Sequence, residues 1–158
     1  MSTTPIITKD ELLKHWQGHR ALTRRVIEAF PEKELFTFSV AGMRPFGALA
    51  KELLSIAVPG LQGIVNRAGE GYTETGLEGI TTKEALLKKW DEDTPQIDEL
   101  YNQIPEADFH ETFNLFGQFN FPIIHNILYF IDNEIHHRGQ GYVYLRSLGI
   151  QPPFFWER

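Results

Sequence analysis

Apolar residues recur at helical spacing in four stretches of the chain, and this periodicity predicts four helices. The first helix covers about residues 9–30. Thr8 and Glu11 have the T-x-x-E spacing of a capping box, which satisfies free N–H groups where a helix begins, and Pro31 ends the helix. One face of this helix carries Leu12, Trp16, Thr23, Ile27 and Phe30.

The second helix covers about residues 45–67 and begins at Pro45, because proline is well tolerated at the first position of a helix. Pro59 and Gly60 fall inside it, so we expect a kink there. The preceding stretch LFTFSVAGM, residues 35–43, alternates apolar and polar residues over a few positions and is predicted to be an extended connection. The buried stripe of the second helix is predicted to contain Phe46, Leu49, Leu53, Ile56 and Leu61.

The third helix covers about residues 82–104 and follows a glycine-rich loop at residues 69–80. Thr81 and Glu84 repeat the T-x-x-E spacing and predict a second capping box at its start. Pro95 lies within the helical stretch, so we expect the helix to be kinked or split there.

The fourth helix covers about residues 121–148 and follows an irregular connection at residues 105–119. It is predicted to begin near Asn120 or Phe121, with Pro122 in its first turn, and to end at Gly149. Four helices without a confident strand predict an all-α fold, a four-helix bundle whose long loops leave other topologies open besides simple up-down. The apolar stripe of this helix contains Ile124, Ile127, Leu128, Ile131 and Ile135.

Length and composition predict one domain that spans residues 1–158. The net charge of −6 argues against nucleic acid as the main partner, because phosphate binding needs a basic surface. No apolar run approaches the 18 residues of a membrane-spanning helix, and the N-terminus lacks the basic and apolar regions of a signal peptide. We therefore expect a cytoplasmic protein with no membrane span.

The chain has no cysteine, so any metal ion must be held by His, Asp, Glu or Asn side chains or by backbone oxygens. His15 and His19 are four residues apart and share a helix face. They are either two ligands of a metal that needs a third or a solvated surface pair, and we favour the surface pair. Glu134 and His137 form the single E-x-x-H motif of the chain, whereas a di-iron bundle needs two such motifs.

Polar groups are concentrated in residues 133–149, NEIHHRGQGYVYLRSLG. Asn133 and His137 are four residues apart and share a face. Arg138 and Gln140 are offset from His137 by about 100° and 300° around the helix, so we expect them on different faces. We predict that Arg138 is structural and is paired with a carboxylate or with carbonyl groups at a helix end.

Two glycines, Gly139 and Gly141, interrupt the same helix, and each costs roughly 1 kcal/mol of helix stability relative to alanine. We therefore expect a close backbone approach at this level, from another helix or from another subunit. Asp132 and His136 lie on a neighbouring face, where His136 is read as an exposed partner of Asp132.

The segment HHRGQGYVYLRSLGIQPP resembles the C-terminal helix of the DinB/YfiT-like superfamily of small metal-binding four-helix proteins, and RPFGALAKELL resembles the start of that family's second helix. The loop and helix lengths fit this family over nearly the whole chain. The resemblance implies a metal site of three histidines, one on the second helix and two on the fourth, with an open coordination position. Family members with an assigned activity resemble thiol-dependent enzymes, in which the metal binds the cofactor sulfur as a thiolate.

The chain departs from this pattern at two of the three ligand positions. By register, the histidine of the second helix falls on Glu52 and the first histidine of the fourth helix falls on Asn133, so only His137 remains. We expect these three residues to converge in one cleft between the second and fourth helices. Such a set binds a divalent ion more weakly than three imidazoles and prefers harder metals. A metal-free hydrogen-bonded cluster, a weak or altered metal site and a site built from other residues are the open alternatives.

Two functions are consistent with this altered ligand set. The first is a DinB-like protein, non-catalytic or weakly metal-binding, that binds a small ligand in the cleft between the second and fourth helices. The second is a metal-dependent S-transferase that uses a low-molecular-weight thiol. We expect no tightly bound metal, with zinc, nickel, manganese and iron as the candidate divalent ions. The resemblance also implies a homodimer, and the aromatic tail PPFFW supports this expectation.

Overall fold

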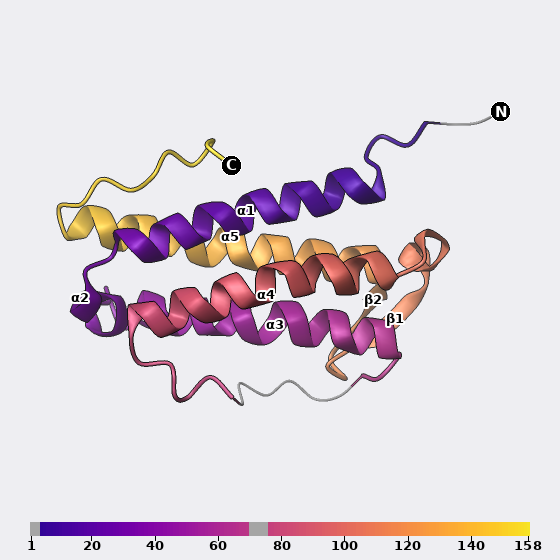
Figure 1. The fold of residues 1–158 in the computed structure, drawn as a ribbon, viewed down its shortest axis with the longest axis horizontal. Helices are drawn as coiled ribbons and strands as arrows, with labels where there is room; N and C mark the ends of the chain where they lie inside the picture. The colour runs from indigo at the N-terminus through magenta and orange to yellow at the C-terminus, as the bar shows by residue number, and fades with distance from the viewer. Residues whose placement is uncertain (1–3, 70–75) are drawn as a thin grey trace.

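Four long helices form the body of the structure, a computed structural model that describes residues 4–69 and 76–158. The helices α1 and α5 run in one direction and α3 and α4 run in the other, with a small hairpin at one end of the bundle (Figure 1). This arrangement confirms the predicted helical bundle. The long helices are α1 (Lys9–Ala29), α3 (Phe46–Asn66), α4 (Lys83–Gln103) and α5 (Ile123–Ser147). The short elements are α2 (Glu32–Thr37), the 3₁₀ helix η1 (Glu106–His110) and the strands β1 (Thr112–Leu115) and β2 (Phe119–Pro122).

Two helix starts show how free backbone N–H groups find hydrogen-bond partners at the end of a helix. At α1, Thr8 and Glu11 form the predicted capping box, with each side chain bonded to the backbone of the other. At α4 the predicted pair was wrong by one residue, because Thr82 is the capping residue and accepts from the Ala85 backbone N–H. A capping oxygen reaches the third residue of the helix, and α4 begins at Lys83.

Proline does not split either helix that contains one. Pro95 lies inside the continuous α4, so the alternative of a split helix is wrong, and Pro59 lies inside the continuous α3. A proline removes only one backbone hydrogen bond, and buried side chains on both sides of Pro95, including Trp90 and Ile97, anchor the helix in the core. The loop predicted at residues 69–80 falls in part on residues 70–75, which lie outside the described residues.

The β-hairpin and the short helix α2 correct the sequence-based assignment. The strands pair antiparallel, with Phe113 opposite Phe121, inside stretches that were predicted to be irregular or helical. Asn120 and Phe121 therefore belong to β2, and α5 begins only at Ile123. Four alternating residues are too short a pattern to separate a strand from a loop. Likewise, α2 covers part of the stretch that was predicted to be extended.

The stripe predicted for the last helix is only partly buried. Ile127 and Ile131 lie in the core, whereas Leu128 and Ile135 are each 39% exposed. The apolar periodicity predicted the helix correctly, but the face that it predicted to be buried is rotated about the helix axis relative to the face that the structure buries. Among the described residues, α3 is the one helix long and apolar enough to cross a membrane, and most of that stretch is buried inside the bundle, as expected of a core helix.

A polar layer crosses the bundle midway along its length and separates two apolar clusters. One cluster contains Trp16 and Phe130 and lies next to the hairpin, and the other contains Phe30 and Phe46 and lies next to α2. Buried polar groups need partners inside the protein, so this layer decides where polar contacts between helices can form. Its buried members are His19, Arg20, Thr23, Ser55, Asp93, Glu134, His137 and Arg138.

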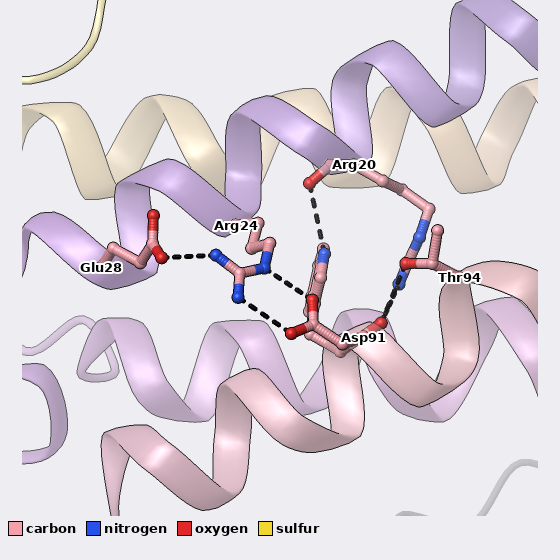
Figure 2. A network of polar contacts seen from close by, with 6 residues as sticks. Arg20, Arg24, Glu28, Asp91 and Thr94 are labelled. Carbon is pink, nitrogen blue, oxygen red and sulfur yellow. Dashed lines mark hydrogen bonds and ion pairs between the residues drawn. The ribbon is translucent and has the colours of Figure 1, made fainter.

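The contact between α1 and α4 shows how this layer joins two helices (Figure 2). Trp90 Nε1 donates to the carbonyl oxygen of Arg20 (3.2 Å), and Arg20 Nη2 donates to the carbonyl oxygen of Trp90 (3.3 Å). The Arg20 guanidinium also lies over the Trp90 ring, 4.2 Å from its centroid. One turn further along α1, Arg24 makes a bidentate pair with Asp91 and an ion pair with Glu28. These contacts fix α1 against α4.

Candidate functional site

The structure brings together the three residues that were predicted as an altered ligand set. Glu52 lies on α3, and Asn133 and His137 lie one turn apart on α5. The distance from His137 Nε2 to Glu52 Oε1 is 3.0 Å, and the distance from Asn133 Nδ2 to the same oxygen is 3.5 Å. The side chains therefore form one hydrogen-bonded cluster between α3 and α5, at the edge of the polar layer.

A fourth residue, Arg44, completes the cluster. It precedes α3, and its Nη2 lies 2.5 Å from Glu52 Oε2. The carbonyl oxygen of Arg44 accepts a hydrogen bond from the Tyr144 hydroxyl (2.8 Å), which ties this segment to α5. Both oxygens of the Glu52 carboxylate are thus bonded, one to His137 and the other to Arg44.

Gln140 also belongs to the cluster, which corrects the expectation that it lies on a different face from His137. Its Oε1 is 2.8 Å from His137 Nδ1, and its Nε2 donates to Met43 Sδ at 3.4 Å. An offset of three residues leaves only about 60° between two side chains, so they are neighbours on the helix surface. Sequence reasoning missed this contact, although the i, i+3 spacing could have indicated it. No local signal pointed to Arg44.

These contacts shift the pKa values of Glu52 and His137 in opposite directions. The hydrogen bond from His137 and the pairing with Arg44 outweigh the effect of burial and lower the pKa of Glu52 to about 2. Burial alone would lower the pKa of His137, but its hydrogen bonds to Glu52 and Gln140 outweigh burial and raise this pKa. The arrangement thus favours a carboxylate that faces a protonated imidazole, with a guanidinium on its other side.

The donor atoms in this arrangement do not fit a divalent metal ion. His137 Nε2 and Glu52 Oε1 bond to each other, Glu52 Oε2 bonds to Arg44, and His137 Nδ1 bonds to Gln140. A metal would need unprotonated donors that point at a common centre. In the part of the chain that the structure describes, no group of three or more His, Asp or Glu residues is placed to hold an ion.

The histidines of α1 differ from the expected surface pair. His15 is exposed, but His19 is buried, and their Nε2 atoms lie 3.2 Å apart. Arg138 Nη2 contacts His19 Nδ1 at 2.8 Å. Burial, together with the charge of Arg138, lowers the pKa of His19 to about 3. This imidazole is therefore a neutral part of the polar layer.

Glu134 points away from His137, so the E-x-x-H motif does not form a shared site. The Glu134 carboxylate is buried and accepts a hydrogen bond from Thr23 (2.6 Å) on α1. Arg138 donates to the carbonyl oxygen of His19 (3.1 Å) and to Thr23 Oγ1 (3.2 Å). Arg138 is thus held by a carbonyl group as predicted, but that carbonyl lies in the middle of α1 and not at a helix end.

The two glycines of α5 have different surroundings. A Cβ atom on Gly141 would lie 2.6 Å from the Phe46 ring, so α3 approaches closely there, as expected. A Cβ atom on Gly139 would have no neighbour within 4 Å, so this position is open. Asp132 and His136 are both exposed.

Comparisons with known proteins agree with this fold. Residues 116–157, which include α5, match the DinB family. The fold is similar to that of a DinB-like protein from Bacillus cereus ATCC 10987, with 18% identity and a TM-score of 0.72 over 92% of this chain and 95% of that one. It is also similar to a DinB-like protein from Bacillus subtilis, with 19% identity and a TM-score of 0.73 over 93% of this chain and 99% of that one. No curated protein matches the chain. The family match thus supports the resemblance to DinB proteins over the C-terminal segment, and the two structures confirm the fold.

Proposed function

Since this chain is a DinB-like protein in its fold and in the family match of its C-terminal segment, we propose that it binds a small ligand between α3 and α5 without a tightly bound metal. The observation that carries this proposal is the cluster of Glu52, Asn133 and His137, in which the only histidine retained from the family pattern is bonded to a carboxylate. Buried polar side chains that satisfy one another need no ion to stabilise them.

The position of the cluster supports a binding role. Glu52 is 18% exposed and Arg44 is 49% exposed, so charged groups reach the surface beside a nearly buried imidazole. A ligand with hydrogen-bonding groups would find both a donor and an acceptor there. We propose that the protein acts as a binding protein in the cytoplasm, with neither nucleic acid nor a membrane as a partner.

A metal-dependent S-transferase that uses a low-molecular-weight thiol is the alternative. Its support is that His137 and Glu52 are both competent ligands that lie 3.0 Å apart. In such an enzyme the metal would supply a thiolate near neutral pH. The chain would have to release Glu52 from Arg44 and His137 before either residue could bind the ion.

Elemental analysis of the purified protein, combined with thermal unfolding in the presence of Zn²⁺, Ni²⁺, Mn²⁺ or Fe²⁺, separates the two functions. We expect less than a tenth of an equivalent of metal and no rise in melting temperature. Stoichiometric metal would overturn the proposal and favour the transferase, which glutathione and a thiol-transfer acceptor would then test.

Ligand binding itself is tested by ligand-observed NMR with a library of small polar compounds. Binding that is lost in His137→Ala but kept in the surface control Arg146→Ala supports the proposed site. A library in which no compound distinguishes the two variants would count against it.

We also propose that the protein forms a homodimer. Exposed aromatic side chains in the tail, Phe154, Phe155 and Trp156, offer apolar surface for a contact. Sedimentation at micromolar concentration should show a species of twice the 18.2 kDa chain mass, and a purely monomeric sample would refute this.

A further inference from the structure

We propose that the Arg44 guanidinium takes the place of a metal cation at the Glu52–His137 pair, so that this chain carries its own cation in the site and excludes a divalent ion. The inference rests on the proposed location of the site, but not on the identity of any ligand. Its starting point is the saturated carboxylate: Glu52 Oε1 bonds to His137 (3.0 Å), and Oε2 bonds to Arg44 (2.5 Å).

The fold holds Arg44 in position for this contact. A turn at Ala41 and Gly42, both with positive φ (51° and 76°), reverses the chain just before Arg44. The buried Tyr144 hydroxyl then binds the Arg44 carbonyl oxygen (2.8 Å). Because Tyr144 lies on α5, the same helix that presents His137 also anchors the segment that carries Arg44.

The chemistry of the two cations explains why they exclude each other. Guanidinium binds a carboxylate through fixed N–H donors and keeps its charge at every accessible pH. A metal bound to Glu52 would lie beside that guanidinium and would be repelled by it. The metal would also need the carboxylate lone pairs that now accept hydrogen bonds from Arg44 and His137. Arg44 therefore compensates the charge of the Glu52 carboxylate without a metal ion, at a site where the family pattern would place two further histidine ligands.

The test uses a variant that supplies a second imidazole. Asn133→His gives a His/His/Glu set, which is a known catalytic zinc donor set. Zinc affinity is measured by competition with a chromophoric chelator for Asn133→His alone and for Asn133→His combined with Arg44→Gln. We expect the combined variant to bind zinc at least tenfold more tightly, because Glu52 is released and the repelling charge is gone.

Lys51→Gln is the matched control. Lys51 neighbours Glu52 in sequence and carries the same charge as Arg44, but its Nζ lies near the Phe36 ring, 5.8 Å from the centroid. Combined with Asn133→His, it should change zinc affinity less than threefold. Arg44→Lys, which keeps the charge, should leave the affinity closer to that of Asn133→His than Arg44→Gln does.

The proposal is overturned if Arg44→Gln changes zinc affinity by less than threefold, if Lys51→Gln has the same effect, or if neither form binds zinc. Should Asn133→His fail to fold, Arg44→Gln is compared with the natural protein by thermal unfolding with zinc, where only the variant should be stabilised. A natural protein with stoichiometric metal would refute both the proposed function and this inference. A metal-free natural protein whose Arg44 variants gain nothing would refute the role of Arg44 alone.

Discussion

Replacement of Arg138 by alanine tests whether the polar layer holds the bundle together. Arg138 is 5% exposed and connects α5 to α1 through the His19 carbonyl oxygen, the His19 ring and Thr23. It also lies near the buried Glu134, whose pKa is raised because the effect of burial outweighs the opposing charges of Arg20 and Arg138. The substitution removes these contacts and leaves Glu134 with less positive charge around it.

The expected cost follows from these contacts. Removal of one partner of a buried charged network typically costs about 3–5 kcal/mol, because the remaining charge stays buried. Arg20 and Thr23 still compensate the charge of Glu134 in part. We therefore expect a loss of unfolding free energy at the lower end of this range, about 3 kcal/mol. For a chain of this size, 1 kcal/mol corresponds to about 2–4 °C, so the melting temperature should fall by roughly 6–12 °C.

Urea and thermal unfolding followed by circular dichroism measure this change. Arg146→Ala is the control, because Arg146 is an exposed arginine on the same helix, and surface substitutions usually stay within about 0.5 kcal/mol. A loss of less than about 1 kcal/mol in Arg138→Ala would refute the structural role. Unchanged stability together with lost ligand binding would make Arg138 a binding residue.

Three further predictions concern the site and the glycines of α5. The double variant Glu52→His with Asn133→His should gain about 2.7 kcal/mol of stability, or roughly 5–10 °C in melting temperature, at zinc concentrations a hundredfold above the dissociation constant for zinc. A melting temperature that zinc does not raise would show that one of the two positions is not a ligand position. Gly141→Ala should destabilise the protein by more than about 1 kcal/mol because the new methyl group meets the Phe46 ring, whereas Gly139→Ala, at an open position, should stabilise it by about 0.5–1 kcal/mol. Chemical denaturation measures both changes, and equal effects would contradict the difference in packing between the two glycines. Because the pKa of Glu52 falls from 4.5 to about 2 on folding, its contribution to stability is complete above about pH 4.5 and is lost as the pH falls towards 2. Glu52→Gln should therefore flatten the acid side of a curve of unfolding free energy against pH. An unchanged acid side would refute the assignment.

The sequence by itself determined the helices and several of their ends. Helical periodicity and capping are local properties, so the four long helices, the Thr8 capping box and the stop at Gly149 follow from neighbouring residues. The same locality placed Asn133 and His137 on one face. The family resemblance added Glu52, and the structure brings these three side chains into contact.

Only the tertiary structure decided which partners these side chains have. Arg44 reaches Glu52 because a turn and the Tyr144 hydroxyl position it. The ring nitrogens of the buried His19 contact Arg138 of α5 and Arg158 of the tail. The side-chain amide of Asn126 on α5 donates to a carbonyl oxygen in each strand and so ties the hairpin to this helix. In each case the interacting groups come from different elements, and their distances depend on how the helices pack. Helix packing is set by the sum of many weak contacts across the chain, and no short stretch of sequence contains that information.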